Sequence, residues 1–379
     1  MPELGSLVSY PTFPPHVLHY HADGPVFQVP TSTRTRGDQP CDEELVAPTT
    51  VQRASPLHNF MEVIGGFDFI ELFGFEKRHF RRLLDELQLP DFIEIHGRGG
   101  RRASRVPVEL ALGVTLWRLE SPATLSRDRM MWGLPEATID ETFDLTIDAI
   151  YDRWGHLVHE LQHEAILPNI DMFCEAIYDC GSPLDRCWGF IGGSTQPIDR
   201  PWRVQTPGRG SGRQRSIALK HQAIDTPDGI IRRLWGPDLG RRHDPALLEG
   251  RKLLQTLRQR FNDAEGTPYY LHGDPAYGLS PWLMTPYAGV LTPAKREFNE
   301  AMGSLRDGDE DGFGKIVELW SSVDYAERWE VDPSTPGLDK EYAVAGILTN
   351  CHSCLYGNST SKYFEVPTPS LRSYLQGQG

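Results

Sequence analysis

Residues 187–195 read CWGFIGGST, and this stretch decides the fold of the second half of the chain. Its apolar part, residues 188–191, is short and is followed at once by glycines, which is typical of a buried strand. A second strand-like run, residues 217–224, leads into the letters TPDG at 226–229. Because Pro, Asp and Gly favour tight turns, we expect this run and the residues from Ile230 onward to form a β-hairpin.

A helix and another strand follow the expected hairpin. Residues 245–261 have apolar residues at helical spacing and begin with Pro, which is favoured in the first turn of a helix. Asp244 precedes this helix and can cap it. We expect residues 269–272 to form a strand that continues as far as Asp274. Strand, hairpin, helix and strand in this order predict an α+β or α/β domain with an RNase H-like fold.

The first half of the chain has a different pattern. Residues 1–55 are rich in Pro, Thr and Ser without periodicity, which predicts a disordered arm. Residues 56–180 predict a small all-helical domain, and its short helices around a glycine turn also admit a helix-turn-helix that reads DNA. The RNase H-like domain then occupies residues 181–379. The expected helices cover residues 67–89, 108–119 after Pro107, two or three segments in 125–154 with Thr138 as an N-cap, and 340–355.

Composition limits the class of protein. The chain has 379 residues, enough for one large or two medium domains with a sizeable core. It contains no apolar run long enough for a transmembrane helix, and six cysteines do not make a disulfide scaffold. A reducing compartment, the nucleus or the cytoplasm, is therefore expected. The net charge of −14 argues against DNA binding through overall charge.

Four further motifs follow the CWGFIGGST stretch in a fixed order. They read GRRHD at 240–244, GDPAY at 273–277, FNEAM at 298–302 with Glu310 and Phe313-Gly314 beyond it, and CHSCLYG at 351–357. Together they resemble the PIF/Harbinger transposases and the nucleases derived from them, a group of DDE-superfamily endonucleases. The resemblance covers roughly residues 75–375.

The resemblance implies a site of three carboxylates that hold divalent metal, Mg²⁺ or Mn²⁺, for cleavage of a DNA phosphodiester. Asp274 matches the second carboxylate and Glu310 matches the third. The first, an Asp on the first strand of the family's domain, is replaced here by Gly192. The resemblance therefore predicts a catalytic site at Gly192, Asp274 and Glu310 that has lost one ligand, holds its metal weakly and has impaired activity.

Further implications concern neighbours of that site. Asp244 matches the family's His-Asp pair and is expected to cap a helix or to support a metal ligand. Family members act with a Myb-like DNA-binding partner, so DNA and such a protein are the implied partners. The alternative within the family is a non-catalytic relic that binds DNA or protein. A basic run is the expected contact to DNA: Arg200, Arg203, Arg209, Arg213, Arg215 and Lys220.

The acidic segment around Glu310 permits a different interpretation. Asp307, Asp309, Asp311 and Glu318 have the spacing of an EF-hand calcium loop with Gly312 at its turn. Gly314 stands where such loops carry an apolar residue, and no second hand is present. We expect the segment to belong to a helix or its disrupted end.

Two histidine and cysteine patterns complete the alternatives. Residues 159–163 read HELQH, the zinc-protease pattern, which needs both His159 and His163 on one helical face and a third ligand such as Glu175. Cys351 and Cys354 have no second cysteine pair, so buried free thiols are expected there rather than zinc.

Overall fold

The computed structural model describes residues 59–96, 104–121, 125–198, 217–241, 247–308, 312–324 and 337–377. Residues 53–379 form one compact unit, and the account below concerns its described residues. The expected disordered arm, residues 1–55, lies outside them.

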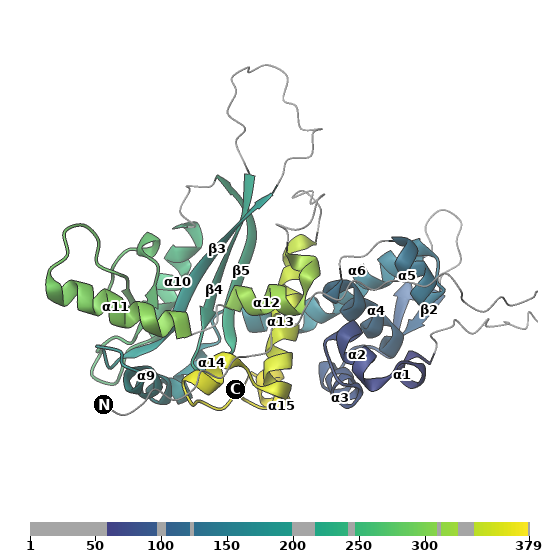
Figure 1. The fold of residues 1–379 in the computed structure, drawn as a ribbon, viewed down its shortest axis with the longest axis horizontal. Coiled ribbons are helices and arrows are strands. Elements are labelled where there is room, and N and C mark those ends of the chain that lie inside the picture. Colours follow the sequence, from purple (N-terminus) through teal and green to yellow (C-terminus); the bar gives the residue numbers. More distant parts are fainter. Residues whose placement is uncertain are drawn as a thin grey trace, which may run out of the picture. The chain divides into compact units, whose positions relative to one another are not determined.

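A five-stranded mixed sheet forms the centre of the second half of the chain (Figure 1). Its strand order is β5-β4-β3-β6-β7, and the central long strand β4 is antiparallel to both β3 and β5. β6 pairs with β3 in parallel, and the long connection between β5 and β6 contains helix α10. This is the order of elements that the sequence predicts for an RNase H-like fold. The strands are β3 Cys187–Ile198, β4 Ile217–Asp225, β5 Ile231–Arg241, β6 Tyr270–Gly273 and β7 Leu283–Met284.

The β4–β5 hairpin confirms the turn read from the letters TPDG. Gly229 has a φ of 76°, in the left-handed region that glycine adopts without strain. The hydroxyl of Thr226 donates to the carboxylate of Asp228 over 2.6 Å, and Arg232 forms a buried ion pair with the same carboxylate. These contacts fix the turn, and the register of the hairpin follows from it.

Helices follow and flank the sheet (Figure 1). α11 ends at Gly308 and α12 begins at Gly312, so two helices run into the acidic segment of the sequence from either side. The last long helix, α13, packs against β5 and is followed by two short helices that the sequence did not predict. The bounds are α9 Ile170–Asp179, α10 Leu247–Arg260, α11 Pro293–Gly308, α12 Gly312–Leu319, α13 Leu338–Tyr356, α14 Ser359–Tyr363 and α15 Leu371–Leu375.

The first half of the described chain is mostly, but not entirely, helical. The expected long helix over 67–89 is divided into two at Gly74, whose φ of 70° ends the first. Thr138 lies inside α6, and Pro135 holds the N-cap position expected for it. A two-stranded sheet, β1 Phe92–Ile95 with β2 Ser104–Pro107, corrects the all-helical prediction. The helices are α1 Phe60–Val63, α2 Gly66–Phe73, α3 Lys77–Leu87, α4 Val108–Glu120, α5 Leu125–Trp132, α6 Glu136–Trp154, α7 His156–His159 and α8 His163–Ile166.

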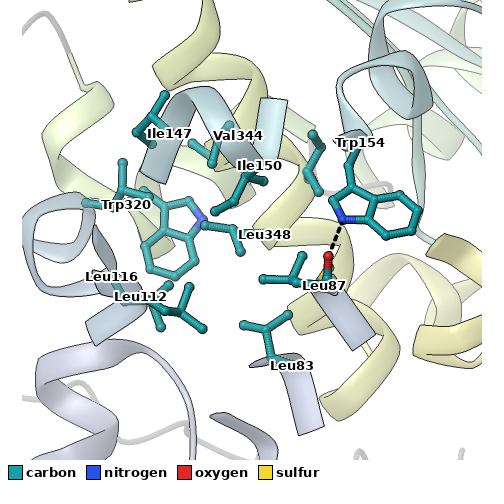
Figure 2. Packing of buried hydrophobic residues seen from close by; sticks show 14 of the residues in the cluster. Leu83, Leu87, Leu112, Leu116, Ile147, Ile150, Trp154, Trp320, Val344 and Leu348 are labelled. Atoms are coloured by element: carbon teal, nitrogen blue, oxygen red, sulfur yellow. Dashed lines mark hydrogen bonds between the residues drawn. The ribbon is translucent and has the colours of Figure 1, made fainter. Parts of the chain in front are cut away.

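One hydrophobic core joins these helices to the C-terminal part of the chain (Figure 2). Leu83, Leu116 and Ile150 belong to the same buried cluster as Leu348 of α13. The indole of Trp154 also donates to the carbonyl oxygen of Leu87 over 2.9 Å. The packing therefore joins the helices of residues 60–158 and the C-terminal part of the described chain in one core.

None of the helices in the described ranges is both long enough and apolar enough to cross a membrane.

Two glycines of α12 give a matched test of the fold. A side chain at Gly312 would collide with the carboxylate of buried Asp225, whereas nothing lies within 4 Å of a side chain at exposed Gly314. We expect Gly312→Ala to lower the free energy of unfolding by about 1–3 kcal/mol through overpacking. Gly314→Ala should raise it by up to about 1 kcal/mol through helix propensity. Urea denaturation followed by circular dichroism measures both; a Gly312→Ala variant as stable as Gly314→Ala would contradict the packing of α12.

Candidate active site

The pairing of β3 with β6 brings two of the predicted site positions together. Phe190 pairs with His272 and Ile191 with Gly273 in parallel register. One more step places Gly192 beside Asp274, the first residue after β6. Because residues in register on parallel strands project from the same face of a sheet, the two positions share one face. A carboxylate at position 192 would therefore emerge next to that of Asp274.

The carboxylate of Asp274 forms an ion pair with Arg306 of α11. The distance from Nη1 to Oδ1 is 2.7 Å, and Nη2 lies 3.5 Å from Oδ2, so the guanidinium faces both carboxylate oxygens. The side chains of Asp274 and Arg306 are 40% and 29% exposed. Both can therefore reach solvent and a ligand, which a buried structural pair could not.

Tyr277 fixes the turn after Asp274 to β3. It ends the short helical turn η2, Pro275–Tyr277, and its hydroxyl donates to the carbonyl oxygen of Gly192 over 3.0 Å. Burial, together with the negative charge of Asp274, raises the pKa of Tyr277 to about 12. The hydroxyl therefore stays protonated and keeps its role as donor. It would also lie 3.2 Å from a side chain at Gly193, which explains the small residue there.

His272 lies beneath the candidate site. It is two residues before Asp274 on β6, only 2% exposed, and its ring contacts the edge of Phe190. Burial, aided by the positive charge of Arg306, lowers the pKa of His272 to about 4. The imidazole is therefore neutral in the folded protein at neutral pH.

Sequence reasoning assigned no role to Arg306, Tyr277 or His272. Tyr277 stands within the GDPAY motif and Arg306 four residues before Glu310, so both lie in segments that were singled out. Their contacts join residues 32 and 85 positions apart, and no local pattern specifies such a contact.

Several predicted site residues lie outside the described residues. The side chain of Asp307, at the end of α11, belongs with them. Lys220, by contrast, is described and corrects one prediction: it lies within β4 and is only 8% exposed, so it is not a surface contact to DNA. The other predicted site residues that lie outside the described residues are Arg200, Arg203, Arg209, Arg213, Arg215, Asp244, Asp309, Glu310 and Asp311.

The described residues do not by themselves complete a metal site. No group of three His, Cys, Asp or Glu side chains among them could hold an ion. Asp274 offers a partly exposed carboxylate of the kind that Mg²⁺ and Mn²⁺ accept, while Gly192 offers none. The described part of the site thus supplies one of the three expected carboxylates.

The calcium-loop interpretation does not fit the backbone. An EF-hand loop would run from Asp307 to Glu318, with ligands in its second half. Helix α12 begins at Gly312, so residues 312–318 are helical and Glu318 lies exposed on that helix. The expectation that the segment belongs to helix ends fits this arrangement, at least up to Gly308 and from Gly312.

The zinc-protease alternative fails on its helix. α7 ends at His159, Glu160 is extended with a φ of −103° and a ψ of 138°, and α8 begins at His163. The two imidazoles are therefore not on one helical face. In α13, Cys351 and Cys354 form no disulfide, and burial raises the pKa of Cys354 to about 12.

Comparison with known protein families finds a match to the part of the chain that contains the candidate site. Residues 191–350 match the family model described as DDE superfamily endonuclease. The match covers less than half of the chain; it begins one residue before Gly192 and includes Asp274, Arg306 and Glu310. No curated protein and no solved structure matches the chain. These residues are therefore similar to a DDE-type endonuclease domain, whose general features are a divalent metal and a DNA substrate.

The buried imidazole makes stability depend on pH. Folding lowers the pKa of His272 from the ordinary 6.5 to about 4. Between these pH values His272 is protonated in the unfolded chain and neutral in the folded chain. The contribution of neutral His272 to the free energy of unfolding is therefore fully present above pH 6.5 and is lost as the pH falls toward 4. We expect the urea midpoint of His272→Leu to fall less between pH 7 and 4.5 than that of the natural chain. Exposed His96→Gln is the control, and an unchanged pH profile in His272→Leu would contradict the assignment.

Proposed function

We propose that this chain contains a PIF/Harbinger-like, DDE-type DNA endonuclease domain whose metal-dependent activity is impaired by the glycine at position 192. One observation carries the proposal: Asp274 directly follows a strand paired in parallel with the strand that bears Gly192, and one further step in that register places the two positions side by side. The match of residues 191–350 to the DDE superfamily endonuclease model supports it.

Cleavage of a phosphodiester by this kind of site depends on carboxylates that share two metal ions. When bound, the ions activate the attacking water and stabilise the leaving oxygen. Asp274 would be one ligand, and Glu310 is proposed as a second, since it lies in the short segment between α11 and α12. Tyr277 holds the backbone of Gly192 against the turn that carries Asp274. With no side chain at position 192, the ligand set is one short.

The substrate and surroundings follow from the same proposal. The substrate is DNA, and a Myb-like protein is proposed as the partner that supplies sequence recognition. The working compartment is proposed to be the nucleus. A chain of net charge −14 needs a local positive field to attract DNA, which the arginines between 200 and 215 are proposed to provide.

A non-catalytic relic that binds DNA or protein is the second candidate. The ion pair between Arg306 and Asp274 favours it, because a guanidinium already neutralises the one described carboxylate. Restoring the missing ligand separates the two candidates.

A nicking assay on supercoiled DNA with Mg²⁺ or Mn²⁺ tests the proposal. We expect little or no cleavage by the natural chain and at least a tenfold increase in Gly192→Asp, since the added carboxylate completes the metal ligands. Removal of one essential ligand in the double variant Gly192→Asp with Asp274→Asn should abolish the gain. Gly192→Asp with Glu310→Gln tests the third position in the same way.

The outcomes divide the candidates. Efficient cleavage by the natural chain would refute impairment and mean that another group supplies the third ligand. Silence from the natural chain and Gly192→Asp, with both folded by circular dichroism, would favour the relic.

A further inference from the structure

We propose that Arg306 is the resident counter-ion of Asp274 and keeps divalent cations from this carboxylate in the protein without DNA. This inference rests on the proposed role of Asp274 as a metal ligand. It adds a residue that determines whether that ligand is available, and it predicts a cation site that becomes strong when one positive charge is removed.

The geometry places the guanidinium where a metal ion would bind. Arg306 faces both oxygens of Asp274, at 2.7 Å and 3.5 Å. Those oxygens carry the electron pairs through which a carboxylate coordinates Mg²⁺ or Mn²⁺. An ion that binds on the side of the carboxylate facing Arg306 must displace the guanidinium, since both cannot occupy that side.

The position of Arg306 is fixed by its helix. Met302 and Leu305 of α11 are 0% and 1% exposed and belong to the core cluster that includes Phe190 of β3. Arg306 follows Leu305 directly, at the edge of this buried face. The anchored helix holds the backbone of Arg306 in place, and a guanidinium that faces both carboxylate oxygens makes a stronger ion pair than the usual contact between surface side chains.

Charge explains why the competition favours arginine in this chain. In the DDE arrangement three carboxylates hold two dications, and the proposed replacement by Gly192 removes one of these carboxylates. A single positive charge on Arg306 matches the single negative charge of Asp274, whereas a dication there would be left partly uncompensated and repelled by the guanidinium. The missing carboxylate at position 192 and the ion pair at Asp274 would both lower the affinity of the site for divalent cations.

Binding of Mn²⁺, measured by electron paramagnetic resonance on the full chain without DNA, tests the proposal. The acidic chain offers other weak sites, so the quantity of interest is the binding that disappears in Asp274→Asn. For this component we expect Arg306→Gln to bind on the order of tenfold more tightly than the natural chain. Arg306→Lys, which keeps the charge but loses the two-pronged contact, should lie between them.

Arg296→Gln is the matched control, because Arg296 is exposed on the same helix and its removal changes the net charge equally. It should alter Mn²⁺ affinity less than twofold. The gain in Arg306→Gln should vanish when Asp274→Asn is added.

Three results would overturn the inference. They are equal Asp274-dependent affinity in the natural chain and Arg306→Gln, a gain that persists in the double variant, and no Asp274-dependent binding in Arg306→Gln or Arg306→Lys. None of these measurements involves cleavage. If Gly192→Asp does not nick DNA but Arg306→Gln shows the expected gain in Mn²⁺ affinity, the proposed nuclease function is contradicted and this inference is not.

Discussion

The parallel pairing of β3 with β6 is the contact on which the candidate site depends. These strands are separated by the β4–β5 hairpin and α10, so their pairing closes a loop of more than seventy residues. Without it, Asp274 would have no defined relation to Gly192. The bond from the Tyr277 hydroxyl to the Gly192 carbonyl oxygen ties the end of β6 back to β3 and fixes the turn that presents Asp274.

The last long helix connects this sheet to the first half of the chain. Asn350 of α13 accepts from the backbone N–H of Ile231, donates to its carbonyl oxygen and donates to the hydroxyl of Tyr374, each over 2.9 Å. The same helix packs Leu348 among the leucines of α3 and α4 (Figure 2). Because α13 packs on β5 and shares one core with the N-terminal helices, these helices stabilise the frame that holds the sheet.

The chemistry of the site is governed by the balance of charge around Asp274. A DDE-type centre concentrates negative charge to hold dications, and its carboxylates repel one another until the metal binds. In the described part of this chain, Gly192 offers no carboxylate and the carboxylate of Asp274 is paired with the guanidinium of Arg306. The cleavage and metal-binding experiments give separate readouts of the proposed loss of a ligand at position 192 and of the Arg306–Asp274 pair.

The sequence by itself determined the local structure and the likeness to DDE endonucleases. The TPDG turn, the helix after Pro107 and the strand just before Asp274 follow from backbone preferences and short-range periodicity, which a single segment carries. It could not show that HELQH breaks between two helices, that residues 92–95 pair as a strand with residues 104–107, or that α13 shares a core with α3 and α4. Those features, and the Arg306–Asp274 ion pair, depend on packing between segments far apart in the chain, where burial and partner geometry override local preference. The tertiary structure alone therefore decided which charges meet at the site.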